Sequence, residues 1–226
     1  MTLNSNPLEE HKSWTQEKVK QFIEDMEDLV EYRYAPFAKR VAKLIKEMNF
    51  NFPITLIDLG CGPGFLLFEL KNLLPNVRLI GIDASEIMLN AAKDLMRKRN
   101  VKNIEFKKSF AENLPFPEES VDVIVSQNSL HDFKNVKNSL IQVFRVLSTD
   151  RIFIDKSRNG SYSKWKRSIK YVEIAIRFGI REAKMVFKGA NKWLNPKDNI
   201  HMMEDIGFEV NLLENKFEYL IFGKKK

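Results

Sequence analysis

The sequence predicts an α/β fold, a doubly wound and mostly parallel sheet of seven strands, with an N-terminal helical cap and a helical insertion. Three observations lead to this prediction. Short apolar strands alternate with helical stretches between residues 54 and 155, a glycine-rich turn follows the first strand, and two strands joined by a tight turn lie at 208–213 and 217–222. Alternation of strands and helices favours a parallel sheet with right-handed crossovers.

The first 50 residues predict the helical cap. One helical pattern runs from residue 14 to 29 and a second from 34 to 48, with Pro36 near its start. The second pattern places apolar side chains at helix spacing, at Phe37, Val41, Leu44, Ile45 and Met48. We therefore expect an amphipathic helix that packs on the sheet.

An apolar run at 54–57 leads into Asp-Leu-Gly-Cys-Gly-Pro-Gly at residues 58–64, which predicts a strand, a tight turn and a helix start. Glycine tolerates positive φ, and we expect the backbone N–H groups of Gly60 and Gly62 to face outward, toward a nucleotide-like ligand. A dinucleotide fingerprint would need a third glycine at position 65, which is Phe65, and no phosphate-binding Gly-Lys-Ser/Thr follows.

The next predicted strand, residues 77–83, ends in Asp83, 19 positions after Gly64. A carboxylate at this place can accept hydrogen bonds from both hydroxyls of a ribose. The alternative is a helix N-cap or a solvated strand end. Ser85 is expected to cap the following helix, which runs to Met96.

Two further stretches follow in order, a strand and loop at 104–117 and a strand and loop at 120–132. Together with 58–64 and 77–85, they resemble the motifs of class I S-adenosylmethionine-dependent methyltransferases, most closely the small-molecule branch that includes quinone-biosynthesis C-methyltransferases. The resemblance covers residues 50–156 and, more weakly, 196–223. It implies S-adenosyl-L-methionine as cofactor, with the glycine loop under its methionine part. A glycine-rich turn in another α/β protein is the alternative.

The resemblance implies a set of cofactor-binding residues, namely Asp58, Gly60, Cys61, Gly62, Gly64, Asp83, Ala84, Ser85, Met88, Ala111, Glu112, Ser126 and Tyr32. The adenine contact stays open. Many relatives have an acidic residue where this chain has Phe110, so Glu112, Asn113 or backbone groups of Ala111 supply the acceptor, or Phe110 stacks on the purine. An N-terminal tyrosine often meets the methionine end, and Tyr34 is the alternative to Tyr32.

His131 is the candidate catalytic base, because it follows the fourth strand and histidine titrates near pH 6.5. Methyl transfer requires alignment of donor and acceptor and, for some acceptors, removal of a proton. The alternative is a histidine that only shapes the pocket. One cysteine and three scattered histidines give no zinc spacing, and the lone Cys61 is expected to be a small loop residue rather than a nucleophile.

The expected insertion or lid, residues 157–195, carries the positive charge of the chain. Within 161–192 nine basic residues and two acidic ones give 9 − 2 = +7, which equals the net charge of all 226 residues. Its apolar residues follow steps of three and four, at Trp165, Ile169, Val172, Ile176, Ile180, Ala183 and Phe187. This pattern predicts an amphipathic helix pair, kinked at Gly179, whose stripe faces the core or closes over an acceptor. The basic face is either solvated or attracts an acidic substrate, a nucleic acid or an anionic membrane surface.

The expected whole is one methyltransferase domain over 1–226, cytoplasmic, acting on a small-molecule acceptor. No apolar run approaches the roughly 18 residues of a membrane span, and the first residues show no leader pattern. Residues 147–151 are expected to form the turn before the fifth strand, although they lack glycine. Two alternatives for function remain: an RNA or protein methyltransferase that uses 161–192, and a catalytically silent, cofactor-binding partner subunit. Ser-Gln-Asn-Ser at 126–129 stands where planar-amine methyltransferases carry Asn-Pro-Pro-Tyr.

Overall fold

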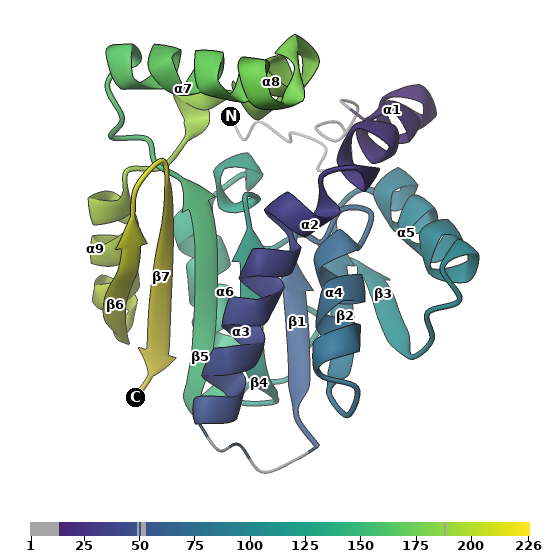
Figure 1. Cartoon of the computed structure of the whole chain (residues 1–226). Coiled ribbons are helices and arrows are strands. Elements are labelled where there is room, and N and C mark those ends of the chain that lie inside the picture. Colours follow the sequence, from purple (N-terminus) through teal and green to yellow (C-terminus); the bar gives the residue numbers. More distant parts are fainter. Residues whose placement is uncertain (1–13, 49, 51–52, 188) are drawn as a thin grey trace, which may run out of the picture.

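The computed structural model describes residues 14–48, 50, 53–187 and 189–226 (Figure 1). Seven strands form one sheet in the order β3-β2-β1-β4-β5-β7-β6. Strands β1 to β5 pair in parallel, whereas β7 is antiparallel to both β5 and β6. The strands are β1 (Thr55–Leu59), β2 (Arg78–Asp83), β3 (Ile104–Lys108), β4 (Val121–Gln127), β5 (Leu147–Arg158), β6 (Phe208–Asn215) and β7 (Glu218–Lys225). The predicted seven-stranded, mostly parallel sheet is confirmed.

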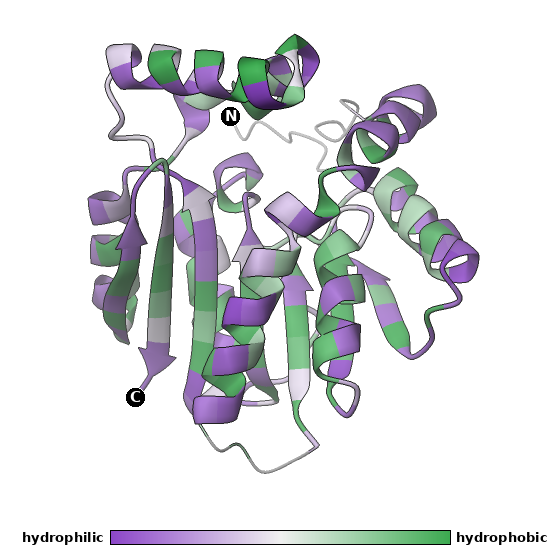
Figure 2. Cartoon of the chain, in the orientation of Figure 1, coloured by the Kyte–Doolittle hydropathy of each residue, from purple (hydrophilic) through white to green (hydrophobic). Residues whose placement is uncertain are grey.

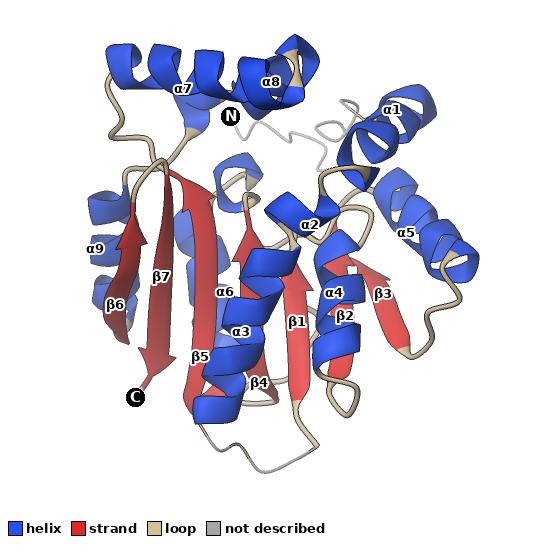
Figure 3. Cartoon of the chain, viewed as in Figure 1, coloured by secondary structure: helices blue, strands red, loops and turns tan. Residues whose placement is uncertain are grey.

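Helices cover both faces of this sheet (Figure 3). One face packs against α1 (Gln16–Glu27), α3 (Ala35–Glu47), α4 (Phe65–Leu73) and α5 (Glu86–Lys98), and the other against α6 (Val136–Val146) and α9 (Pro196–Ile206). The central strands therefore bury both of their faces. In β4, Val123 and Val125 join one hydrophobic cluster, and Ile124 between them joins the other. This two-sided burial is typical of parallel strands.

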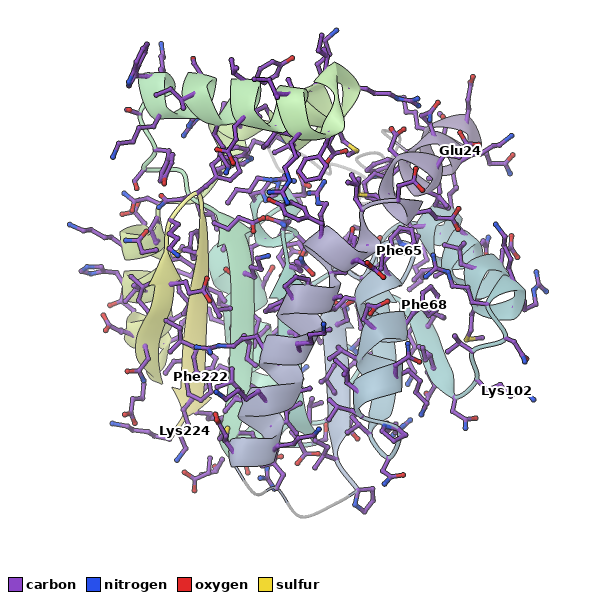
Figure 4. All side chains as sticks on the ribbon, in the orientation of Figure 1. Glu24, Phe65, Phe68, Lys102, Phe222 and Lys224 are labelled. Carbon is purple, nitrogen blue, oxygen red and sulfur yellow. The ribbon has the colours of Figure 1, made fainter. Side chains whose placement is uncertain are left out.

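The N-terminal cap is confirmed, with one difference in its first part. The expected single helix over 14–29 begins later, after the N-cap Thr15, and a short helix α2 (Val30–Arg33) stands between α1 and α3. In α4, which follows the glycine loop, Phe65 and Phe68 project from the helix (Figure 4) and the guanidinium of Arg99 lies 5.3 and 5.4 Å from their ring centroids. Arg99, at the end of α5, also forms an ion pair with Glu27 of α1 at 3.6 Å, so the cap contacts the helices beside the glycine loop.

The expected turn at 147–151 is wrong. These residues belong to the first half of β5, which spans Leu147 to Arg158. Asp150 takes the positive φ of 64° that a glycine would otherwise supply, and the pairing of β4 with β5 shifts register between Val121 and Val123. Aspartate tolerates the left-handed region better than most residues, so Asp150 takes this conformation where a glycine is absent.

The insertion forms the expected helix pair, α7 (Lys164–Phe178) and α8 (Ile180–Phe187), and breaks at Gly179, whose φ is +100°. The pair lies across the carboxyl ends of the parallel strands (Figure 1). Its buried apolar side chains are Ile174, Ala183 and Val186, which pack with Phe217 from the turn between β6 and β7. A short 3₁₀ helix, η2 (Ala190–Lys192), leads back to α9.

The expected orientation of the apolar stripe is wrong for α7 and the start of α8. Trp165, Ile169, Val172, Ile176 and Ile180 are between 51% and 82% exposed. Only the end of the stripe, at Ala183 and the partly buried Phe187, meets the core. The helix turns its Ile174 face inward, so the stripe neither packs on the sheet nor covers a site beneath it.

Candidate functional site

The glycine loop joins β1 to α4 at the carboxyl edge of the sheet. Gly60, Gly62 and Gly64 all have positive φ, between 51° and 82°, as the sequence predicts. The expectation of outward-facing N–H groups is wrong: Gly60 donates to the Ile82 carbonyl at 2.8 Å, and Gly62 donates to Oδ2 of Asp83 at 2.9 Å. These hydrogen bonds join the loop to the end of β2. They fix the shape of the loop in the absence of a ligand.

The space around the three glycines differs, and this difference locates the ligand side of the loop. A Cβ at Gly60 would lie 2.4 Å from Cβ of Ser129, and one at Gly64 would lie 3.1 Å from the ring of Phe106. At Gly62 a Cβ would meet no atom within 4 Å. At Gly60 and Gly64 a larger side chain would collide with the folded protein. The α-carbon of Gly62 instead faces open space that a ligand can occupy.

Two carboxylates stand next to the loop. Asp58 of β1 is buried, and burial raises its pKa to about 8, with the nearby charge of Asp83 adding to the rise. Oδ1 of Asp83 accepts the N–H of Ser85 at 2.8 Å, while Oδ2 accepts that of Gly62. Each oxygen of Asp83 keeps acceptor capacity for a second donor. Two acidic groups so close together favour a ligand that brings positive charge.

The start of α5 forms as predicted. Ser85 is the N-cap, and its Oγ accepts the N–H of Met88 at 3.3 Å. The Met88 side chain is buried and that of Ala84 is half-buried. In the loop after β3, Ala111 is buried. Glu112 accepts the N–H of Asn135 at 2.8 Å, and Asn135 is the N-cap residue of α6. One oxygen of Glu112 is thus engaged, and the choice among the adenine acceptors stays a prediction.

Ser126, at the end of β4, is fully buried. Its Oγ lies 2.6 Å from Oγ of Ser129, which also donates to the carbonyl of Leu59 at 2.8 Å. This chain of hydroxyls joins the ends of β4 and β1 and backs the α-carbon of Gly60. The geometry gives Ser126 a positioning role under the loop, and direct contact with a cofactor stays a prediction.

Cys61 behaves as the sequence predicts. Its thiol is buried and lies 3.6 Å from the carbonyl of Gly62, and burial raises its pKa well above the ordinary thiol value. A thiol that stays protonated is a poor nucleophile. The side chain therefore fills space in the loop.

His131 lies in a short 3₁₀ helix, η1 (Leu130–Asp132), directly after β4. Its side chain is 7% exposed, and Nε2 lies 3.6 Å from Oδ2 of Asp132. Burial lowers its pKa below the ordinary value, and the positive charges of Arg158 and Lys192 lower it further, against the opposing effect of Asp132. The imidazole is therefore neutral near pH 7 and able to accept a proton.

Arg158, the last residue of β5, is a functional candidate that the sequence did not reveal. It is 8% exposed, and its guanidinium forms no hydrogen bond or ion pair with the residues that the structure describes. Burial and the neighbouring Arg33 lower its pKa to about 10, so the group is charged at neutral pH. Trp193 supplies one wall, with its ring centroid 5.6 Å from the guanidinium carbon. The charges of Glu218 and Glu182 offset part of the lowering of the pKa of Arg158, and the donors of the guanidinium can bind an anionic ligand.

The cap and the insertion meet above this edge. Arg33 of α2 forms an ion pair with Glu182 of α8 at 2.7 Å, and Arg181 of α8 forms one with Asp25 of α1 at 2.9 Å. The carbonyl of Arg33 also accepts the side-chain amide of Gln127, at the end of β4, at 2.7 Å. These contacts hold α7 and α8 in place as a fixed cover rather than a free arm.

The two candidate tyrosines face different partners. The ring of Tyr32 packs on Phe178 at 4.6 Å and under Arg177, both in α7. The ring of Tyr34 packs on Phe65, the first residue after the glycine loop, at 5.4 Å. Burial raises the pKa of Tyr34, and Asp58 contributes to this rise. The structure therefore brings Tyr34, rather than Tyr32, to the glycine loop.

Comparison with known proteins places this geometry in a family. The family model described as a methyltransferase domain matches residues 53–203, which include β1 to β5, the glycine loop and Asp83. The chain belongs to the methyltransferase domain family. Its glycine loop, acidic β2 end and sheet order are those expected of a class I S-adenosylmethionine-dependent methyltransferase, and S-adenosyl-L-methionine is its cofactor.

Individual relatives agree with this assignment. The chain is 33% identical over 191 residues to an uncharacterized methyltransferase of Schizosaccharomyces pombe, covering 81% of this chain and 70% of the relative. It is 29% identical over 195 residues to a demethylmenaquinone methyltransferase of Thermotoga maritima, covering 82% and 80%. A SAM-dependent methyltransferase of Aquifex aeolicus shares the fold, with a TM-score of 0.68, 20% identity, and coverage of 93% and 98%. Against two other curated methyltransferases, the chain spans only 43% and 42% of their length.

The residues of this methyltransferase fit its cofactor. S-adenosyl-L-methionine carries an ammonium and a sulfonium. Asp83 supplies negative charge at the glycine loop, and a cation bound there would lower the raised pKa of Asp58 and favour its charged form. The open space at Gly62 admits a ligand against the backbone. Asp83, with acceptor capacity left on both oxygens, suits the ribose hydroxyls. The end of β2 therefore offers acceptors for a ribose, and the ends of β4 and β5 lie at the same carboxyl edge of the sheet.

Proposed function

We propose that this methyltransferase transfers the methyl group of S-adenosyl-L-methionine to a small-molecule acceptor that carries an oxyanion, a carboxylate or an ionised hydroxyl. The observation that carries the proposal is the buried guanidinium of Arg158, charged and without an ion pair among the described side chains. Gln127 pairs with Lys156, so Arg158 lies two residues beyond the paired end of β4. The charge of Arg158 lowers the pKa of His131, which follows β4 at the same edge of the sheet.

The cofactor, when bound, supplies an electrophilic methyl group on a sulfonium. The chain supports the transfer in three ways. Asp83 balances positive charge at the glycine loop, and Arg158 holds the oxyanion of the acceptor through a charge-assisted hydrogen bond. Where the atom that takes the methyl group carries a proton, neutral His131 accepts it; an oxyanion that is itself methylated loses none. The buried ring of Trp193 forms one wall beside the guanidinium of Arg158.

Two residue assignments refine the site. Tyr34, packed on Phe65 beside the glycine loop, is the tyrosine that we assign to the methionine end of the cofactor. Gly62, rather than Gly60, is the glycine that we place in contact with the ligand, because its α-carbon faces open space. Relatives named for demethylmenaquinone, whose reduced form has ionisable hydroxyl groups, are compatible with an oxyanionic acceptor.

Matched pairs of acceptors test the proposal. Each pair contains an acid and its neutral amide or ether, and formation of S-adenosylhomocysteine is measured for the parent and for Arg158→Gln. We expect the parent to prefer the acidic member by about tenfold or more, since a hydrogen bond to a charged group is worth about 1.5–3 kcal/mol. Arg158→Gln should lose this preference while it binds S-adenosylhomocysteine as tightly as the parent. A preference that survives the substitution would contradict the role of Arg158.

The test also separates the alternatives. Turnover with an RNA or a protein substrate, and with no small molecule of either kind, would favour the macromolecular reading. Cofactor binding without turnover on any substrate would favour the silent partner subunit. The structure lends little support to the RNA reading, because two basic residues of the insertion are engaged: Arg181 pairs with Asp25, and Arg167 donates to two backbone carbonyls.

A further inference from the structure

The outer face of α7 carries a continuous line of large apolar side chains. Trp165 is 73% exposed, Ile169 51%, Val172 54% and Ile176 82%, and Ile180 at the start of α8 is 62% exposed. The spacing of four, three and four residues places the four side chains of α7 in one row along that helix, and Ile180 follows directly after the break at Gly179. Figure 2 shows hydrophobic segments recurring along α7, and in Figure 4 side chains project from this helix away from the rest of the molecule.

We call these five residues the outer stripe. Scattered exposed apolar residues are normal on a protein surface, but a contiguous exposed patch marks an interaction site. The buried face of α7 is the opposite one, around Ile174, so the outer stripe is not an unfinished part of the core. The folded domain leaves the stripe uncovered.

Positive charge flanks the outer stripe. Lys164, Lys166, Arg177 and Lys184 are exposed on α7 and α8. Glu173 is the one exposed acid in the described parts of these two helices, and Lys170 neutralises it in an ion pair. A helix at 3.6 residues per turn places Lys166 and Arg177 on one side of the stripe and Lys164 on the other. The apolar row is therefore bordered by cations.

This combination selects among possible occupants. A second copy of the chain would bury the stripe but would also bring the same basic rims together, and like charges oppose such pairing. A nucleic acid would meet the lysines but would leave the isoleucines and Val172 uncovered. An anionic bilayer satisfies both features, because an amphipathic helix lying in the interface buries its apolar row among the lipids while its cations meet the headgroup phosphates.

Dimensions and residue types agree with an interfacial position. From Trp165 to Ile176 the stripe is about 16 Å long at 1.5 Å per residue, which is enough to lie in the headgroup layer but too short to cross a bilayer. Tryptophan, the residue at one end, is enriched at membrane interfaces. Among the residues that the structure describes, no helix combines the length and apolar character of a membrane span.

We propose that α7 is a peripheral membrane-docking helix that lays the outer stripe into the interface of an anionic bilayer. The ion pairs Arg33–Glu182 and Arg181–Asp25 make the helix pair part of the rigid domain, so the whole molecule docks with α7 facing the lipid. Docking uses the face of α7 that points away from the sheet, so it leaves the glycine loop and Arg158 untouched. The inference stands whether or not the acceptor is an oxyanion.

Vesicle flotation tests this inference with the full chain. Phosphatidylcholine vesicles with and without phosphatidylglycerol are compared at low and high salt. We expect binding to the anionic vesicles only, weakened by salt. Ile176→Glu should weaken this binding by at least about tenfold, because burying an isoleucine side chain is worth that factor or more. Ile141→Glu is the matched control, since Ile141 is 42% exposed on α6, away from the stripe, and this variant should bind vesicles like the parent.

A second variant tests the charges. Replacing Lys164, Lys166 and Lys184 with glutamate should abolish the difference between the two vesicle types and leave the affinity for S-adenosylhomocysteine and the melting temperature close to those of the parent. Absence of binding to anionic vesicles would overturn the proposal, as would equal binding by Ile176→Glu and the parent. So would a concentration-dependent dimer that Ile176→Glu dissolves, because the stripe would then belong to a second copy.

Discussion

Replacement of Gly62 by alanine separates ligand contact from folding at the glycine loop. An added Cβ at this position meets no protein atom within 4 Å, so the folded domain has room for it. The cost to folding comes from the backbone, because φ is +51° and a non-glycine residue in the left-handed region loses about 1–2 kcal/mol. For a chain of this length we expect the melting temperature to fall by about 2–8 °C.

The effect on cofactor binding should be larger than this strain. If the methionine part of S-adenosylhomocysteine lies against Gly62, a methyl group there overpacks the site, which typically costs about 1–3 kcal/mol. The dissociation constant should then rise by about 5- to 150-fold, measured by calorimetry on the folded variant.

Gly189→Ala is the matched control. Gly189 also has positive φ, +75°, and a Cβ there would meet no atom within 4 Å. It should lose a similar amount of thermal stability and bind S-adenosylhomocysteine like the parent. If Gly62→Ala is folded and binds as tightly as Gly189→Ala, the cofactor does not lie against Gly62 and the reasoning from open space is refuted.

Three further predictions concern charged side chains. Asp83→Asn should weaken S-adenosylhomocysteine binding by roughly tenfold or more, because a ribose hydroxyl loses a charged acceptor worth about 1.5–3 kcal/mol; calorimetry that shows parental affinity would remove the ribose role. Burial raises the pKa of Asp155 to about 8, so above about pH 4 the folded state binds a proton that the unfolded state has lost, and stability falls as the pH rises toward 8. In thermal melts of Asp155→Asn this fall should be shallower. An unchanged slope would exclude Asp155 as its source. Glu182→Ala should expose α7 and α8 to faster hydrogen exchange, because it leaves Arg33 without its partner, whereas the exposed Glu173→Ala should not, and equal exchange in both would mean that the ion pair does not hold the insertion.

Local sequence patterns predicted the part of the candidate site that surrounds the glycine loop. The spacing from β1 through the glycines to Asp83 predicted the turn, the positive φ angles and the capped helix, because each depends on a few neighbouring residues. It did not predict where the loop N–H groups bind. Their acceptors, the Ile82 carbonyl and the Asp83 carboxylate, come from the next strand, and only the folded sheet brings them together.

The insertion shows a different limit. A period of three and four residues tells which side chains share a helix face, but it does not tell which face meets the core. Small and aromatic partners decide that: Ile174, Ala183 and Val186 fit against Phe217, so the larger row ending in Ile180 turns outward. The aromatic contacts of Trp193 with Phe187 and Phe217, at 5.4 and 5.5 Å, fix this choice and join residues that are distant in sequence.

The sequence did not indicate Arg158 as a site residue, for a related reason. The fifth strand was expected at 152–155, and nothing in its pattern signals that β5 continues to an arginine buried at the carboxyl edge. Its Cα partner is Glu218 in β7, yet that carboxylate pairs with Lys156 at 2.8 Å and leaves the guanidinium available. Such an arrangement depends on side-chain geometry across three strands, which a single sequence does not encode in any local motif.

A crystal structure with S-adenosylhomocysteine tests the central claim most directly. The account predicts ribose hydroxyls on the carboxylate of Asp83, the methionine part against Gly62 with its ammonium near Asp58, and the sulfur directed toward the space between His131 and Arg158. A ribose placed away from Asp83, or a sulfur directed away from His131 and Arg158, would contradict the account of both the cofactor site and the acceptor side.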